Sequence, residues 1–190
     1  MLLVMKKWNL VLILVFLTID LIGQTALNET VNPVKENVSQ YREIFWNNLP
    51  KRVNWTTDYE GILSNAEEEK LNNLISNFEK ETSIEIAIVT IDTIKVSKEN
   101  FDDLSLHIAK NWTVGKKGKD NGVLIGFSKE YRKIRIELGD GTIKVLSEKE
   151  TKEIIENNFI PEFLKGRYYQ GLLNGTMKLM EVLRMKIKQQ

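Results

Sequence analysis

The chain has 190 residues, 42% of them hydrophobic, which is enough for one well-packed core and a small additional segment. Its 27 basic and 26 acidic residues nearly cancel, so no overall field favours nucleic acid, and we expect no nucleic-acid partner. The absence of cysteine excludes thiol nucleophiles, disulfides and cysteine-bound metals, and a single histidine, His107, excludes histidine-rich metal sites.

The first 24 residues have the layout of a targeting segment. Lys6 and Lys7 precede an almost continuous apolar run, Leu10–Ile19. This run is shorter than the about 20 residues that a membrane-spanning helix needs, and it suits the apolar region of a signal peptide. We therefore interpret residues 1–24 as a signal peptide, with an uncleaved N-terminal anchor as the alternative. Either reading predicts an extracytoplasmic protein, periplasmic or secreted.

Residues 25–50 are predicted to form a polar linker. Apolar side chains recur in it at spacings of three to four, which favours a short helix. These side chains are Val34, Val38, Tyr41, Phe45 and Leu49. The folded domain is expected to follow, over residues 51–186.

The first half of this domain reads as helix, strand and helix. Ser64 and Glu67 form a capping box, which predicts a helix that ends at about Lys80. The β-branched run Ile84–Ile91 predicts a strand. A second helix is expected to start at Ser97 or Asn100, to include Trp112 and to be ended by Gly115 and Gly118.

A β-hairpin is expected next. The apolar run Val123–Phe127 predicts a strand buried on both faces, and the alternating run 133–138 predicts a strand with one wet face. The order strand, helix, strand predicts that the first two strands pair in parallel, with the hairpin adding an antiparallel third. A brief fourth strand is expected over Thr142–Leu146.

The C-terminal part reads as helical. Ser147 and Glu150 form a second capping box, for a helix to about Asn158, and a short helix is expected between Pro161 and Gly166. The last helix begins at about Tyr168 with an apolar stripe of Leu172, Leu173, Met177, Met180 and Leu183. The fold class is therefore α/β, with a mixed sheet of three or four strands and helices packed against it.

The hairpin carries the strongest indication of a site. A turn centred near Glu130 places Asp120 opposite Asp140, both in glycine-containing loops at the open end of the hairpin. Two neighbouring carboxylates are unfavourable unless a positive charge lies between them. Calcium prefers carboxylate and backbone carbonyl oxygens, so we expect a calcium site there, with other divalent cations as alternatives.

Three segments resemble the TPM domain family. They are TDYEGILS at 57–64, WTVGKKGKDNGVLIGFSKEYRKIRIELGDG at 112–141 and NFIPEFLKGRYYQGL at 158–172. Together they follow the family's order and spacing through nearly all of the part predicted to be exported. The resemblance implies an α/β sandwich on the extracytoplasmic or lumenal side. For some members it also implies divalent-ion binding, usually of calcium, and an acid phosphatase activity.

The resemblance carries over two acidic residues, Asp58 and Asp120. After the hairpin the sequence departs from the family pattern, because Asp140 stands between the glycines where an aromatic residue is common. Glu148 is the next acidic position. The predicted metal ligands are therefore Asp58, Asp120, Asp140 and Glu148, with Asp120 as the candidate catalytic residue. The structural alternative is that Asp58 and Asp120 only close turns.

These observations favour a monomeric, calcium-binding module of the cell envelope that docks to a membrane-protein partner or assists its assembly. The first alternative is a metal-assisted acid phosphatase, with Lys116, Lys117 and Lys119 as anion contacts and Arg132 at the far end of the hairpin. The second is a secreted protein that binds peptide or glycan through an aromatic platform of Trp55, Tyr168 and Tyr169.

Overall fold

The computed structural model describes residues 34–189, so the predicted signal peptide or anchor and the beginning of the linker lie outside the described residues. The chain divides into two compact units, 1–44 and 45–190. Residues 34–47 are helical. Within the described range, no helix is both long enough and apolar enough to cross a membrane.

The second unit is built on a four-stranded sheet with the order β1-β2-β3-β4. Its strands are β1 (Thr56–Asp58), β2 (Glu85–Thr90), β3 (Gly122–Ser128) and β4 (Lys133–Leu138). The first three are parallel, and β4 is antiparallel to β3. The α/β class, the parallel pairing of β2 with β3 and the hairpin are therefore confirmed.

The predicted fourth strand is wrong in its position. Residues 142–146 form turns, in which the Leu146 N–H donates to the Thr142 carbonyl at 3.0 Å. The fourth strand is β1 instead, at the opposite edge of the sheet. Its three residues, TTD, are polar and too few to show an alternating pattern.

The helices follow the predicted order closely. They are α2 (Asn65–Thr82), α3 (Phe101–Asn111), α4 (Glu148–Ile154), α5 (Ile160–Phe163) and α6 (Tyr168–Ile187), with a π-helical turn, η1 (Ile155–Phe159), between α4 and α5. Both capping boxes are present, at the start of α2 and at the start of α4. Each satisfies N–H groups that a helix start would otherwise leave unpaired.

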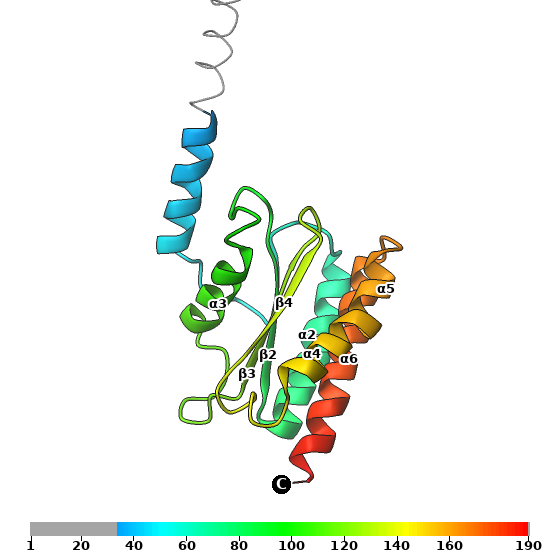
Figure 1. Ribbon diagram of the computed structural model, residues 1–190. Coiled ribbons are helices and arrows are strands. Elements are labelled where there is room, and N and C mark those ends of the chain that lie inside the picture. Colours follow the sequence, from blue (N-terminus) through cyan, green and yellow to red (C-terminus); the bar gives the residue numbers. More distant parts are fainter. Residues whose placement is uncertain (1–33, 190) are drawn as a thin grey trace, which may run out of the picture. The chain divides into compact units, whose positions relative to one another are not determined.

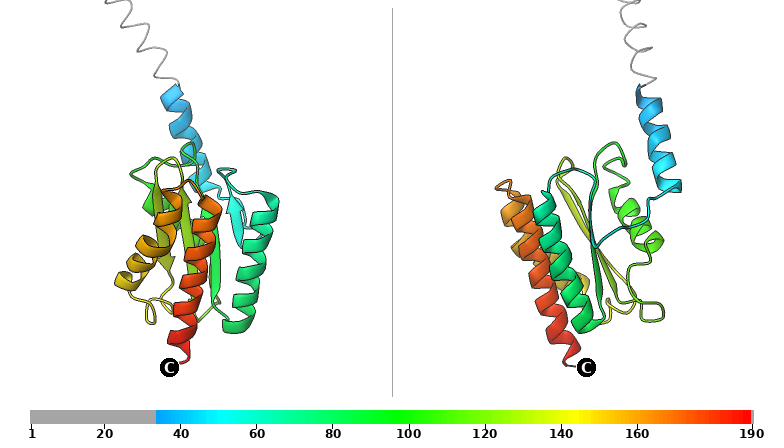
Figure 2. Two further views of the ribbon diagram at one scale, coloured as in Figure 1. Left: turned by 90° about the vertical axis from the view of Figure 1, so that its right-hand side faces the viewer. Right: turned by 180° about the vertical axis from the view of Figure 1, so that it is seen from behind.

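The domain has three layers, because α3 covers one face of the sheet while α2 and α6, with α4 and α5, cover the other (Figures 1 and 2). All residues of β2 and β3 are buried, as strands covered on both faces must be. Ile86, Ile88 and Ile125 belong to the core cluster that includes side chains of α2 and α6. Val89 and Leu124 belong to the cluster on the α3 side.

One residue of the predicted apolar stripe on α6 does not face the core. Met177 is 52% exposed, so its assignment to the core is wrong. The buried face runs instead through Gly175 and Thr176. A Cβ atom at Gly175 would lie 2.1 Å from the ring of Phe159, so this glycine admits the aromatic side chain against the helix.

Candidate functional site at the two ends of the sheet

The carboxyl ends of parallel strands are the usual place for a ligand in an α/β sheet. Here Asp58 ends β1 and lies opposite Thr90, the last residue of β2. One carboxylate oxygen of Asp58 accepts the Leu63 N–H at 2.7 Å, and the other accepts the Thr90 hydroxyl. Both oxygens therefore close the turn after β1 and join it to β2.

Glu60 lies at the same end and links the loop after β1 to β3. Its N–H donates to Thr90 Oγ1 at 3.0 Å, and its carboxylate accepts the Ser128 hydroxyl at 3.1 Å and the Lys129 N–H at 2.9 Å. Burial raises the pKa of Glu60, and the negative charge of Asp58 raises it further. The hydrogen bonds that the Glu60 carboxylate accepts from Lys129 and Ser128 lower the pKa and partly offset this rise.

The sequence analysis missed Glu60 because it occupies the variable position of the D-Y-x-G motif. The only available signal was a second acid two residues after Asp58. Such a spacing is common on exposed loops and points to no particular chemistry.

A third acid approaches this end from α2. Burial raises the pKa of Glu68, and the negative charge of Asp58 raises it further. Nevertheless, no group of three or more histidine, aspartate or glutamate side chains within residues 34–189 is arranged to hold a metal ion. The carboxyl end is thus a hydrogen-bonded network in which Asp58 and Glu60 tie three strands together.

The opposite end of the sheet holds the open end of the hairpin. Val123 pairs with Leu138, and beyond this pair the Gly139 N–H donates to the Gly122 carbonyl at 2.9 Å. The Gly141 N–H then donates to the Asp120 carbonyl at 3.0 Å. Asp120 therefore lies opposite Gly141, one residue from the partner that the sequence predicted.

Glycines allow the two loops at this end to touch through their backbones. A Cβ atom at Gly139 would lie 2.1 Å from the Asp120 carbonyl oxygen, and one at Gly141 would lie 2.0 Å from the Lys119 oxygen. Asp120 itself has a φ of 47°, in the left-handed region that aspartate tolerates better than most residues. The backbone geometry thus fixes where the Asp120 and Asp140 side chains begin.

The side chains of Asp120 and Asp140 are both exposed. Within the described part of the chain, neither carboxylate has a hydrogen bond or an ion pair. Glu148, also exposed, is the first residue of α4 and follows the turns that leave this end. Because Asp58 lies at the other end of the sheet, the four predicted ligands do not form one cluster.

A buried ion pair anchors the loop that contains Asp120. The Glu85 side chain is 7% exposed and binds Arg52 through one oxygen, while its other oxygen accepts the Gly115 N–H at 3.1 Å. Lys116, predicted as an anion contact, is instead paired with Glu79, whose hydrogen bond and charge raise the pKa of the lysine. Removing either partner of the buried Arg52–Glu85 pair is expected to cost more stability than the pair itself contributes, because the other charge stays buried.

The remaining cations lie where the sequence placed them. Lys117 and Lys119 are exposed in the loop before β3. Arg132 lies in the turn between β3 and β4 with a φ of 51°, at the opposite end of the hairpin from Asp120. Lys117 and Lys119, unlike Arg132, are therefore close in the chain to Asp120.

The single histidine has a structural contact. The His107 ring stacks on Trp46 with their centroids 4.2 Å apart, and its Nε2 lies 2.9 Å from the Trp46 carbonyl oxygen. A carbonyl only accepts, so Nε2 carries the proton in this bond. This contact gives His107 a role in packing.

The predicted aromatic platform does not form. The Tyr168 ring packs 5.7 Å from Phe127, and Tyr168 and Tyr169 line a pocket with Gly166. Trp55 lines a different cleft, beside α2, and its indole N–H donates to Glu79 at 2.8 Å.

A mixed sheet between one helix and a layer of helices, with acidic residues at both ends, defines this chain as an α/β sandwich domain. The family model described as TPM domain matches residues 56–182. The chain therefore belongs to the TPM domain family.

Solved structures support the same fold. The N-terminal domain of a protein from P. gingivalis is 31% identical, with a TM-score of 0.63, and the match covers 70% of this chain and 84% of that one. The BA42 protein of Bizionia argentinensis is 26% identical, with a TM-score of 0.58 and coverage of 67% and 86%. The N-terminal domain of the cg2496 protein of Corynebacterium glutamicum, at 14% identity, a TM-score of 0.51 and coverage of 70% and 80%, is similar in fold alone. No curated protein matches the chain.

Proposed function

We propose that this protein is an exported TPM domain that binds calcium at the open end of the hairpin and serves as a docking module in the cell envelope. The proposal rests on one observation. Asp120 and Asp140 extend from two loops that are joined by the bond from the Gly141 N–H to the Asp120 carbonyl, and both carboxylates are exposed without a protein partner among the described residues.

The ligand set at this end fits a hydrated ion rather than an enclosed one. Calcium takes about six to eight oxygen ligands, and carboxylates, carbonyls and water all serve. Asp120 and Asp140 would supply the carboxylates, and Glu148 is the next acid after Asp140 along the chain. Asp58 instead accepts hydrogen bonds at the other end of the sheet. With Lys117 and Lys119 nearby, we expect weak binding, with a Kd of about 10⁻⁴–10⁻³ M, as in extracellular modules.

Calorimetry on the full-length chain tests this site. Wild-type protein should release or absorb heat saturably with calcium and should melt at a higher temperature when calcium is bound, because the ligand binds only the native state. The double variant Asp120→Asn/Asp140→Asn should lose both responses. Asp103→Asn, which removes one exposed charge from the first turn of α3, is the matched control and should bind like wild type.

Two outcomes would reject the calcium site. One is the absence of any wild-type response up to about 10 mM calcium, which is beyond the weak range of protein sites. The other is unchanged binding by the double variant, which would place the ion elsewhere on the chain.

The docking role is proposed for an integral membrane protein as partner. Support comes from Leu164, a large apolar side chain that is 81% exposed at the end of α5. A photo-crosslinking residue at position 164, introduced in the native envelope, should capture one membrane protein reproducibly. The same probe at exposed Lys152 is the control, and equal labelling from both positions would reject a specific surface.

Phosphomonoester hydrolysis is the second candidate. It is favoured by exposed Lys117 and Lys119, which are placed near Asp120 in sequence and could contact phosphate oxygens. A bound ion would supply further charge neutralisation and activate water. With p-nitrophenyl phosphate and calcium, an enzyme should lose turnover in the Asp120→Asn variant while its melting temperature is kept. Absence of turnover by wild type would remove this candidate.

A further inference from the structure

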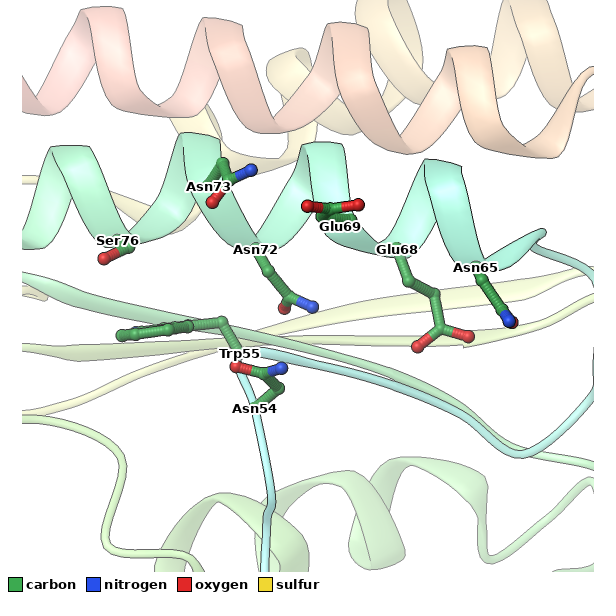
Figure 3. A pocket seen from close by; sticks show the side chains of 8 residues that line it. All are labelled: Asn54, Trp55, Asn65, Glu68, Glu69, Asn72, Asn73 and Ser76. Atoms are coloured by element: carbon green, nitrogen blue, oxygen red, sulfur yellow. The ribbon is translucent and has the colours of Figure 1, made fainter.

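A polar cleft lies between α2 and the segment that enters β1. Its volume is about 340 Å³. Asn54 and Trp55 line it from the β1 side, and six residues line it from α2, between Asn65 and Ser76. Figure 3 shows the six side chains of α2 along the helix, with Asn54 and Trp55 on the neighbouring segment. We call it the amide cleft.

The lining has an unusual chemistry. Four of its eight side chains are carboxamides, namely Asn54, Asn65, Asn72 and Asn73, and the others are Trp55, Glu68, Glu69 and Ser76. No lysine or arginine is among them, and two carboxylates repel an anion, so phosphate and other anionic ligands do not fit. Carboxamides both donate and accept hydrogen bonds, which suits a ligand rich in hydroxyl groups.

Asn72 is held in a defined orientation. Its Oδ1 accepts the Thr56 N–H at 2.7 Å, and because a backbone N–H only donates, the amide oxygen must face the strand. The Asn72 amide nitrogen, with two donor hydrogens, has no partner within residues 34–189. It is available to a ligand in the cleft, beside Glu68 (Figure 3).

The hydrogen bond from the Thr56 N–H to Asn72 Oδ1 also argues against an extended peptide as the ligand. β1 is the edge strand of the sheet, and an extended peptide can add to such an edge through backbone hydrogen bonds. Here Asn72 already occupies the Thr56 N–H, and β1 has only three residues. The cleft therefore does not offer the open ladder that a peptide strand requires.

Trp55 is preorganised at the floor of the cleft. The Trp55 carbonyl accepts the Ile88 N–H at 2.7 Å, the indole N–H donates to Glu79 at 2.8 Å, and the ring packs against the core below α2. The ring therefore loses little further freedom when a ligand binds. A fixed aromatic face beside polar groups matches the two sides of a sugar, with its C–H face and its hydroxyl rim.

We propose that the amide cleft binds an uncharged oligosaccharide, with a sugar ring against Trp55 and hydroxyl or acetamido groups hydrogen-bonded to Asn65, Asn72 and Asn73. From Asn65 to Ser76 the helix rises about 16 Å, so a short oligosaccharide lies along it better than a single sugar. This site is separate from the calcium site, and each can fail without the other.

The test is a ¹⁵N NMR titration of the full-length chain with two uncharged probes, cellotetraose and the tetramer of N-acetylglucosamine. At least one should cause saturable shifts of the Trp55 indole N–H and of the Asn72 side-chain amide. The variant Asn65→Ala/Asn73→Ala changes two exposed side chains and should fold normally. Loss of two hydrogen bonds should weaken its binding about tenfold.

Asn157→Ala/Asn158→Ala is the matched control, because these asparagines line a different groove beside α6. It should bind with wild-type affinity. The proposal is overturned if neither probe binds at about 10 mM, a very weak affinity. It is also overturned if Asn65→Ala/Asn73→Ala binds like wild type, or if an anionic probe, trigalacturonate, binds more tightly than both uncharged ones. Shifts of the β1 amides with an extended peptide, but not with sugars, would assign the cleft to peptides instead.

Discussion

The two ends of the sheet use aspartate in opposite ways. At the carboxyl end of β1, Asp58 accepts two hydrogen bonds from the protein and is part of a network with Glu60 and Thr90. At the open end of the hairpin, Asp120 contributes its backbone to the structure and leaves its side chain in solvent. A matched family position can therefore be structural at one end and available to a ligand at the other.

The difference comes from what holds each end together. The carboxyl end is closed by side chains, so the carboxylates of Asp58 and Glu60 already accept hydrogen bonds from the protein. The hairpin end is closed by backbone contacts between glycine-containing loops and by the Glu85 anchor below them. Because glycine lets the main chains approach directly, the acidic side chains there are not needed for closure.

The largest effect is expected where the backbones touch. A Cβ atom at Gly122 would lie 1.9 Å from the Val114 carbonyl oxygen, and the main chain has no room to yield without moving a loop. Gly122→Ala should lower the free energy of unfolding by about 3 kcal/mol, as overpacking does. Urea unfolding of the full-length chain measures it.

Gly118→Ala is the control for that experiment. Gly118 has a positive φ, of 80°, and a Cβ atom there would meet nothing within 4 Å. Its cost should be limited to the left-handed conformation, about 1 kcal/mol. If Gly122→Ala costs no more than Gly118→Ala, the close backbone contact is contradicted.

The next effect separates the two aspartates directly. Asp58→Asn keeps the shape of the side chain but removes its charge and replaces one acceptor oxygen with an NH₂ group. One of the bonds from the Leu63 N–H and the Thr90 hydroxyl is then lost, so the free energy of unfolding should fall by about 2 kcal/mol. Asp120→Asn should change stability by less than about 0.5 kcal/mol, since asparagine also tolerates positive φ. Equal losses in chemical denaturation would remove the distinction between the two ends.

Most of the fold could be predicted because its signals are local. The capping boxes of Ser64 and Ser147, the alternation in β4 and the apolar run of β3 each depend on neighbouring residues only. β1 could not be predicted, since three polar residues become a strand only when β2 is beside them. Met177 was misplaced because the packing of Phe159 on Gly175 decides which side of α6 faces inward.

The site was predictable only in part, for a related reason. Hairpin register brought Asp120 close to its true partner because the turn length fixes pairing. The place of Asp58 depended on β1, which the sequence did not reveal. The amide cleft could not be predicted either. Its asparagines are spread along an ordinary helix surface, and only the folded chain brings Trp55 beside them.

The smallest expected effect is a difference in pH dependence between two glutamates. Burial raises the pKa of Glu60 above its value in the unfolded chain. As the pH falls, the Glu60 carboxylate therefore becomes protonated in the native state before it does in the unfolded state. The cost of its buried charge is present above the raised pKa and is relieved below it. Hydrogen bonds from Lys186 and Ser147 lower the pKa of Glu150 to about 2, so its contribution is present at neutral pH and is lost as the pH falls toward that value.

The two shifts predict opposite slopes in one experiment. Urea unfolding between about pH 3 and pH 7 spans the ordinary carboxyl range. As the pH falls, wild type should gain stability relative to Glu60→Gln and lose stability relative to Glu150→Gln. Parallel curves for wild type and Glu60→Gln would mean that water reaches Glu60 freely. The carboxyl end would then be as open as the hairpin end, and the contrast between the two would rest on hydrogen bonds alone.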